Sequence, residues 1–273
     1  MGAEACDARP LIFAPEGARP IFFLHIPKTS GSSTNAFLRA LYGKGAVVEH
    51  VEYQLPDLLA GRRVAIRAPC VSGHVPLWAW RLYRGAEHYA CVTILRDPWA
   101  RLVSHVNWVA KYAAGAKLPP GAGGVALGRV AALVEATDFE SVAGLRKLMI
   151  AVKAEPNFAS FDNYQVRMLR AWRMDAMEGR LGDADLSVAE AELASFLHVG
   201  FCEDQAAFQA DLMSKLGKRA EVTPIRANRA SVHRLRADNL LAREVFAPWL
   251  ELDQGLYGFA RGRFRRDGAP AAG

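Results

Sequence analysis

Apolar stretches of strand length alternate with segments of helical periodicity through the first half of the chain. The predicted strands are residues 20–26 (PIFFLHI), 46–51, 68–75 and 88–97. The predicted helices are residues 33–43, 56–61, 76–83 and one that opens at Pro98, with Asp97 as its N-cap. Strands that alternate with helices are typical of a parallel sheet covered on both faces. We therefore expect an α/β fold.

The second half of the chain has mainly helical periodicity. The predicted helices are residues 125–136, 139–152, 164–172, 187–197 and 204–217, and one late strand is predicted at 198–203. The Gly- and Pro-rich stretch 115–124 either divides two domains or forms a surface loop, and the pattern after it favours a flexible loop. We expect one domain over residues 1–273, with frayed ends at 1–18 and 265–273.

The overall charge is basic, and the composition is that of a globular protein. Hydrophobic residues make up 51% and charged residues 23% of the 273 positions, enough for a sizeable core. The net charge of +6 favours anionic partners such as a nucleotide or an acidic sugar, although an ordinary basic surface would have the same charge. The candidate site described below favours a nucleotide over a nucleic acid.

Cysteine usage and the N-terminus indicate the compartment. The four cysteines are Cys6, Cys70, Cys91 and Cys202. None forms a CxxC pair, and none has a zinc-type spacing to histidine, so we expect free thiols in a reducing compartment. The N-terminus lacks the pattern of a signal peptide, and no apolar run approaches the roughly 20 residues of a membrane helix. The sequence thus predicts a cytoplasmic protein without a membrane span.

A polar turn follows the first predicted strand. The segment FLHIPKTSGSST (23–34) leads from apolar residues into Lys28, Gly31 and a group of hydroxyl side chains. These hydroxyl residues are Thr29, Ser30, Ser32, Ser33 and Thr34. A helix N-terminus at the carboxyl edge of a parallel sheet attracts anions, and a glycine permits close backbone approach. The turn is suited to a phosphate or sulfate, and equally to a structural role as a Ser-rich, capped β–α connection.

The first turn does not match the Walker A motif. That motif places its lysine directly after the second glycine of GxxxxGK[ST]. Lys28 instead precedes Gly31 by three residues. This order disfavours an ordinary P-loop kinase or ATPase.

A second turn of similar design follows the strongest predicted strand. Arg96 stands at the carboxyl end of residues 88–97, and Arg101, Ser104 and Trp108 follow at helical spacing. If the two strands are neighbours, Lys28 and Arg96 face one crevice and form adjacent anion sites. Arg96 could otherwise form only a capping ion pair with Asp97.

The two turns together resemble the donor-binding elements of sulfotransferases. Residues 23–34 look like the 5′-phosphosulfate-binding loop, and ILRDPWARLVSHV (94–106) looks like the 3′-phosphate-binding element. The likeness is to carbohydrate sulfotransferases that include heparan sulfate 2-O-sulfotransferase and its bacterial relatives. Ser30 stands where the family usually has glycine, whereas the RDPxxRxxS pattern is matched without a gap. Weaker likeness extends to residues 161–171, 198–217 and 252–264, so it covers most of the chain.

The resemblance implies a P-loop-like α/β fold and a defined donor. The donor would be 3′-phosphoadenosine 5′-phosphosulfate (PAPS), the product adenosine 3′,5′-bisphosphate (PAP), and no metal would be required. Lys28 would stabilise the leaving phosphate with the α-helix N-terminus and the hydroxyls of residues 29–34, whereas Arg96 and Ser104 would hold the 3′-phosphate. The acceptor would be a carbohydrate hydroxyl. Its pocket is expected near the loop 115–124 and the basic segment 225–236.

His74 is the preferred candidate for the general base. It follows Gly73 at the end of a predicted strand, on the same sheet edge as Lys28, and imidazole suits proton abstraction near neutral pH. The resembling proteins carry a GHV-type segment whose histidine acts as the base. They also have a histidine two residues earlier, where this chain has Ser72. Other bases remain open, namely Glu49, His50 and Glu52 at the end of the second strand.

Two other functions fit parts of the sequence. A P-loop-type nucleotide-dependent kinase would also use an anion-binding turn, and a non-catalytic nucleotide or polyanion binder would use the basic surface. The sequence does not specify the acceptor, a choice between O- and N-sulfation, or the oligomeric state.

Overall fold

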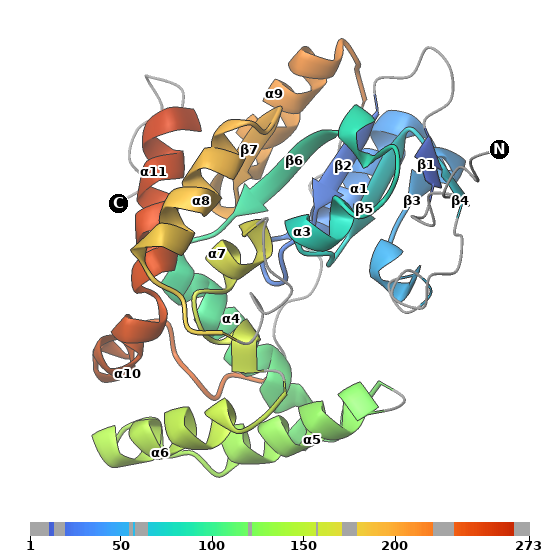
Figure 1. The fold of residues 1–273 in the computed structure, drawn as a ribbon. Helices are drawn as coiled ribbons and strands as arrows, with labels where there is room; N and C mark the ends of the chain where they lie inside the picture. Colours follow the sequence, from blue (N-terminus) through green and yellow to red (C-terminus); the bar gives the residue numbers. More distant parts are fainter. Residues whose placement is uncertain are drawn as a thin grey trace, which may run out of the picture.

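A five-stranded parallel sheet forms the centre of the computed structural model, in the order β3-β5-β2-β6-β7 (Figure 1). Its strands are β2 (Ile21–Leu24), β3 (Val47–Val48), β5 (Cys70–Gly73), β6 (Ala90–Leu95) and β7 (His198–Phe201). The structure describes residues 11–13, 20–54, 57, 65–119, 122–156, 158–170, 179–220 and 232–264. The predicted α/β class, with a parallel sheet flanked by helices and a largely helical second half, is confirmed.

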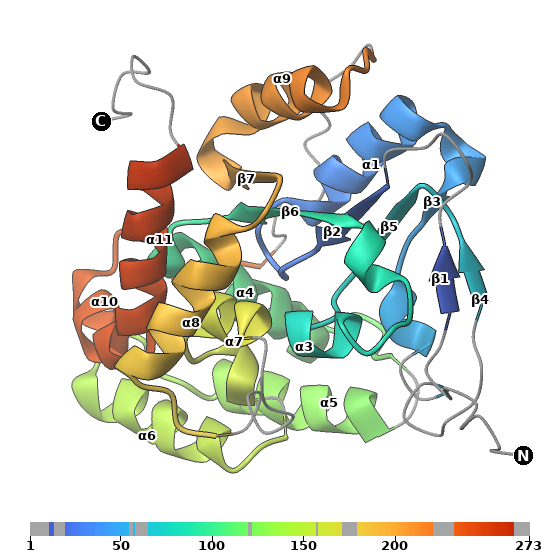
Figure 2. The ribbon, with the colours of Figure 1, turned by 45° about the horizontal axis from the view of Figure 1, so that its top comes forward.

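Helices cover both faces of the sheet because the side chains of its strands alternate between two apolar cores. Ile21 and Phe23 pack on one face and Phe22 and Leu24 on the other, and all four are fully buried. The first face is covered by α1 (Gly31–Tyr42) and α9 (Gln205–Leu216), which lie above the sheet in Figure 2. The second face is covered by α3 (Leu77–Trp80), α7 (Tyr164–Leu169), α8 (Asp183–Ala194) and α11 (Glu251–Phe264).

A third apolar core lies beyond the sheet edge. It is built by α4 (Pro98–Ala113), α5 (Ala122–Glu135), α6 (Val142–Lys153) and α10 (Leu240–Phe246). α4 starts at the end of β6 and packs along α5, so it connects the sheet with this helical layer (Figure 1). In the described part of the chain, no helix combines the length and the apolarity that crossing a membrane requires.

Several predicted boundaries change in the structure. The strand expected at 46–51 shortens to β3 and is followed by a 3₁₀ turn, η2 (Val51–Gln54), and α5 begins inside the expected loop 115–124. Neither α10 nor α11 was predicted, nor the separate parallel pair β1 (Leu11–Phe13) and β4 (Ala65–Arg67). β1 lies inside the end expected to fray. The rest of 1–18 apart from β1, all of 265–273, most of 56–61, and residues 120–121 and 225–231 lie outside the described residues.

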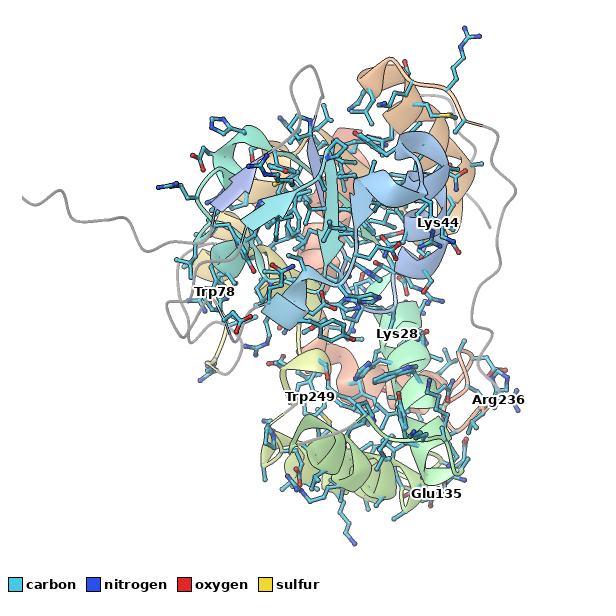
Figure 3. All side chains as sticks on the ribbon, turned by 90° about the vertical axis from the view of Figure 1, so that its right-hand side faces the viewer. Lys28, Lys44, Trp78, Glu135, Arg236 and Trp249 are labelled. Atoms are coloured by element: carbon cyan, nitrogen blue, oxygen red, sulfur yellow. The ribbon has the colours of Figure 1, made fainter. Side chains whose placement is uncertain are left out.

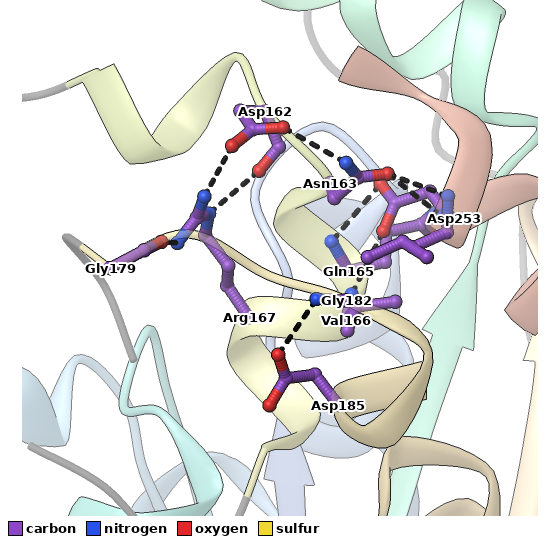
Figure 4. A network of polar contacts seen from close by, with 10 residues as sticks. Asp162, Asn163, Gln165, Val166, Arg167, Gly179, Gly182, Asp185 and Asp253 are labelled. Carbon is purple, nitrogen blue, oxygen red and sulfur yellow. Dashed lines mark hydrogen bonds and ion pairs between the residues drawn. The ribbon is translucent and has the colours of Figure 1, made fainter. Parts of the chain in front are cut away.

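Two buried side chains tie α7 to α11 by capping each other's helix (Figure 4). Oδ1 of Asn163 accepts hydrogen bonds from the backbone N–H groups of Leu252 and Asp253, at 2.9 and 3.0 Å. The Asp253 carboxylate in turn accepts from the N–H groups of Gln165 and Val166, at 3.2 and 2.9 Å. Burial raises the pKa of Asp253 to about 6, whereas the nearby Arg101 and these N–H donors oppose that rise.

The same network reaches the carboxyl edge of the sheet through Gln165. Its side-chain amide exchanges two hydrogen bonds with the backbone of Arg96, at 3.0 Å from the Arg96 N–H and 2.9 Å to the Arg96 carbonyl. The turn after β6 is therefore held by α7, which is itself held by α11. This arrangement fixes the backbone from which the Arg96 side chain extends.

Replacing Asn163 by alanine should destabilise the protein by about 2–3 kcal/mol, because two buried N–H groups lose their acceptor. Asn163 also adopts a left-handed backbone, with φ of 44°, which alanine disfavours. Urea unfolding monitored by circular dichroism measures the change. Ser187→Ala on α8 is the matched control, since its exposed hydroxyl only bonds the carbonyl one turn earlier and its loss should cost less than about 0.5 kcal/mol. Equal effects of the two substitutions would contradict the capping role.

Candidate functional site

The two polar turns lie side by side at the carboxyl edge of the sheet. β2 pairs directly with β5 and with β6, so Leu24 stands opposite Gly73 on one side and Thr93 on the other. The neighbouring positions predicted for the two turns are thus confirmed. The Arg96 guanidinium donates a hydrogen bond from Nη1 to the Lys28 carbonyl, at 3.1 Å. One contact therefore joins the turn after β2 to the turn after β6.

The turn after β2 has a strained backbone. Lys28 and Ser30 both have positive φ angles, of 72° and 69°, which non-glycine residues rarely adopt. α1 begins at Gly31, two residues before the start at Ser33 that the sequence pattern predicted. The first N–H groups of a helix have no acceptor within the helix, and they carry the positive end of its dipole. These donors face the carboxyl edge of the sheet.

The hydroxyl groups of the turn divide into two kinds. Thr29 is fully buried, and its hydroxyl donates to the Ile26 carbonyl at 2.8 Å. The Thr34 hydroxyl, also buried, donates to the Ser30 carbonyl at 3.3 Å. Both threonine hydroxyls therefore stabilise the turn itself. Ser32 differs, because it is exposed and lines the cavity described below.

Two further serines of the predicted site have other surroundings. The Ser30 hydroxyl contacts the thiol of Cys202, which follows β7, with 2.6 Å between Oγ and Sγ. Ser33 is half-buried on the first turn of α1. Both residues contribute their backbone to the start of α1, Ser30 as the N-cap and Ser33 in the first turn.

A neighbouring imidazole ring leaves no space for a side chain at position 31, where the chain has glycine. A Cβ atom at this position would lie 1.6 Å from Nε2 of His25. The His25 ring packs between this glycine, the ring of Phe23 and the ring of His74, with ring centres 5.5 and 4.0 Å away. Burial lowers the pKa of His25 to about 2, with smaller contributions from His74, His50 and Lys28. His25 is therefore neutral, and it forms part of the cavity wall.

His74 follows β5 and is held by two hydrogen bonds. Its Nδ1 lies 2.6 Å from the His25 carbonyl, and its backbone N–H donates to Oε2 of Glu52 at 3.0 Å. A carbonyl can only accept, so Nδ1 carries the proton and Nε2 keeps its lone pair. Burial lowers the pKa of His74, whereas Glu52 opposes that change. His74 is half-buried and lines the cavity.

The three alternative bases have distinct partners. Glu49 forms an ion pair with Arg39 of α1. His50 and Glu52 form a second pair, with 3.0 Å between Nδ1 and Oε1, and Glu52 also holds His74. Glu49 is thus engaged away from His74, whereas His50 and Glu52 lie beside it.

Four cationic side chains gather at this edge. Burial lowers the pKa of Lys28 to about 8, and the positive charges of Lys111, Arg96 and Arg101 lower it further. At neutral pH Lys28 is therefore mostly protonated. Over the described ranges, none of the four forms an ion pair with a carboxylate, and Asp97 caps α4 through the Ala100 N–H instead of pairing with Arg96. The buried Asp253 carboxylate lies near Arg101 and partly balances its charge, whereas Lys28, Arg96 and Lys111 have no carboxylate ion-pair partner among the described residues.

Aromatic rings support two of these cations. Lys28 and Lys111 lie over the Trp108 ring, with Nζ 5.7 and 5.3 Å from its centre. Arg101 points inward from α4, is fully buried, and donates to the Ser160 carbonyl at 2.9 Å. Of the residues expected on one face of α4, Trp108 and Ser104 line the cavity, whereas Arg101 faces the interior.

A cavity of about 760 Å³ opens beside these groups. Its walls combine the polar edge of the sheet with the helical layer of α4 and α5. Lining residues from the turns are His25, Pro27, Lys28, Ser32 and His74, and those from the helical layer include Ser104, His105, Trp108, Lys111, Leu127 and Val130. Figure 3 shows Lys28 at the junction between the sheet with α1 and the green helices of that layer.

Sequence reasoning missed the part of the cavity that the helical layer forms. Lys111 lies seven residues after Ser104 and three after Trp108, so helical periodicity alone could have placed it on the same face. Tyr164 and Phe161 also line the cavity, and only the tertiary packing of α7 brings them there.

Comparisons with known proteins yield a distant likeness to solved structures. No family model matches the chain, and no curated protein is similar to it. Among solved structures, a crystal structure of mouse sulfotransferase SULT7A1 complexed with PAP is 11% identical, over 92% of this chain and 86% of that chain, with a TM-score of 0.22. A likeness at that TM-score supports no conclusion about this chain.

Substituting Gly31 by alanine should cost about 1–3 kcal/mol of stability, since the new methyl group overlaps the His25 ring. Gly45→Ala is the matched control, because nothing lies within 4 Å of a Cβ built there. In the His25→Ala background the cost of Gly31→Ala should fall by about 1 kcal/mol or more. Thermal or urea unfolding of the four variants measures this coupling. Additive losses would show that the two residues do not compete for the same space.

Proposed function

We propose that the protein is a sulfotransferase that moves a sulfuryl group from PAPS to an acceptor hydroxyl. The observation that carries this proposal is the group of cations formed by Lys28, Arg96 and Lys111, at the edge where two strand–turn–helix units meet. Buried or half-buried charges require partners. Within the described residues Asp253 lies near the interior Arg101, whereas none of these three cations forms an ion pair with a carboxylate. A ligand with several anionic groups would provide such partners.

A nucleotide with phosphates at both ends of one nucleoside fits two adjacent turns. Neighbouring strands lie about 4.8 Å apart, so the helix starts after β2 and β6 are within the span of one adenosine bisphosphate. Lys28 and the N-terminus of α1 are proposed to hold the 5′-phosphosulfate, with Ser32 as the accessible hydroxyl. Arg96 and Ser104 are proposed to hold the 3′-phosphate, for which a guanidinium is a natural partner.

The proposed reaction moves one sulfuryl group to the acceptor and one proton from the acceptor to His74. His74 accepts the proton of the acceptor hydroxyl at Nε2, the acceptor oxygen forms a bond to sulfur, and the bond from sulfur to the 5′-phosphate oxygen breaks. The leaving phosphate gains negative charge, which Lys28 and the N–H groups of α1 stabilise. The Nδ1 contact with the His25 carbonyl supports this role, because it fixes the tautomer and the ring orientation. The products are the sulfated acceptor and PAP.

The acceptor is proposed to be a carbohydrate hydroxyl, as the family resemblance implies. Pro119, Gly123 and Gly124, which come from the segment 115–124, line the cavity, so this segment can contact an acceptor next to His74. The cytoplasmic location also remains a proposal, supported by the free thiols of Cys70, Cys91 and Cys202.

The protein should bind PAP in preference to ADP and ATP, because only PAP carries a phosphate for each turn. A thermal-shift titration compares the three nucleotides, as a ligand that binds the native state raises the melting temperature. Lys28→Ala and Arg96→Ala should each weaken PAP binding about 10- to 100-fold, the effect of losing one charge-assisted contact. Lys44→Ala is the control, since this exposed lysine lies apart from Lys28 in Figure 3.

Two outcomes of that titration would contradict the proposal. Equal shifts with PAP and ADP would remove the reason for a 3′-phosphate site. Tight, magnesium-dependent binding of ATP would instead favour a nucleotide-dependent kinase.

His74→Ala should lower the rate of sulfuryl transfer by about 10²- to 10⁴-fold, the usual contribution of a general base. PAP affinity should change less than about threefold, because His74 is not assigned to the nucleotide. Transfer from ³⁵S-labelled PAPS to a panel of hydroxylated sugars measures the rate, with His88→Ala on the exposed surface as the control. Nucleotide binding without any turnover in the unmodified protein would favour a non-catalytic binder.

A further inference from the structure

Three potential metal ligands converge beside the cavity. His50, Glu52 and His74 each offer one ligand atom, an imidazole nitrogen or a carboxylate oxygen, and these atoms lie within 4.8 Å of one another. His50 and Glu52 come from the segment after β3, and His74 comes from the end of β5, the strand that pairs with β3. No other group of three such side chains occurs in the part of the chain that the structure describes.

Hydrogen bonds already involve all three of these side chains. One oxygen of Glu52 accepts from the backbone N–H of His74, and the other lies 3.0 Å from Nδ1 of His50. Gly73 leaves the space for this carboxylate, because a Cβ there would lie 2.6 Å from Oε2 of Glu52. Nδ1 of His74 contacts the His25 carbonyl, the outer contact that metal-binding histidines usually make. The ligands therefore need little rearrangement to meet an ion.

The backbone at His50 supports the same interpretation. Its φ angle is 58°, a strained value for a residue that is not glycine, and such strain is concentrated at functional sites. The side chain of His50 is about half exposed, so it can adjust to complete the ligand set.

The ligand types indicate zinc. Two imidazoles and one carboxylate are a common set in zinc sites that keep a fourth position open, whereas Ca²⁺ and Mg²⁺ prefer sites built from oxygen ligands. Glu52 supplies one negative charge, and both histidines coordinate as neutral groups. The open position would face the cavity that His74 lines.

We infer that His50, Glu52 and His74 form a Zn²⁺ site, and that Zn²⁺ bound there inhibits the enzyme by occupying the lone pair of His74. The proposed binding site depends only on the three side chains. The inhibitory effect rests on the proposed function, because it requires His74 to act as the base. A bound ion would couple zinc availability to the rate of transfer without contacting the nucleotide.

Metal titration of the full chain tests the site independently of activity. After treatment with a chelator, Co²⁺ is added as a spectroscopic probe and Zn²⁺ is measured by calorimetry. We expect one saturable site per chain, visible absorption bands of Co²⁺ bound to nitrogen and oxygen ligands, and loss of those bands when Zn²⁺ is added. His50→Ala and Glu52→Gln should each weaken Zn²⁺ binding at least tenfold.

His88→Ala is the matched control, because His88 and Glu87 form another exposed pair, 3.9 Å apart, that belongs to no group of three ligands. Circular dichroism confirms that each variant is folded before titration. Absence of a saturable site in the folded wild type would overturn the proposal, and so would equal affinities of His50→Ala and His88→Ala.

The inhibitory effect is measured as the ratio of transfer rates with and without saturating Zn²⁺. That ratio should be well below one for the wild type and close to one for His50→Ala. Saturable zinc binding with an unchanged or increased rate would overturn the inhibitory role and leave the site. If the protein transfers no sulfuryl group at all, the proposed function fails, whereas the metal titration still decides whether the site exists.

Discussion

The pairing of β2 with both β5 and β6 is the constraint on which the candidate site depends. Because all three strands are parallel, the segments that follow them emerge at one edge, and a single register fixes their relative heights. The turn with Lys28, the turn with Arg96 and the segment with His74 therefore share one edge, although they are far apart in sequence. The bond between Arg96 and the Lys28 carbonyl then joins two of these segments directly.

The cations at this edge differ from two buried arginines elsewhere in the protein in whether acidic side chains pair with them. Buried Arg167 and Arg170 have acidic partners, in Asp162 and Asp185. Of the cations near the sheet edge, the interior Arg101 lies close to the Asp253 carboxylate, whereas Lys28, Arg96 and Lys111 have no carboxylate ion-pair partner within the described residues. Burial, followed by the charges of the neighbouring cations, lowers the pKa of Lys28, and an anion bound beside it would oppose that lowering.

The sequence predicted the elements that have strong local signals. The apolar strands and Asp97 as the N-cap of α4 follow from periodicity and capping preferences. That the strands before the two turns are neighbours was a condition of the site hypothesis, and the strand pairing of the structure meets it. The sequence did not predict α10 and α11, although Leu252, Leu256 and Ala260 of α11 recur at helical spacing and pack in one core. Nor could it predict which hydroxyls of residues 29–34 face inward, because that depends on the positive φ angles of Lys28 and Ser30.

Gly31 in the first turn makes room for a side chain of the protein, whereas the motif suggested that it makes room for a ligand. A glycine near a phosphate suggests close approach of a ligand to the backbone, yet here the space beside Gly31 is filled by the His25 ring. That ring also contacts the tilted ring of His74, and the His25 carbonyl holds Nδ1 of His74. His25 thus contacts both the start of α1 and the His74 side chain. One neutral, buried ring therefore links the first turn of α1 to the proposed base.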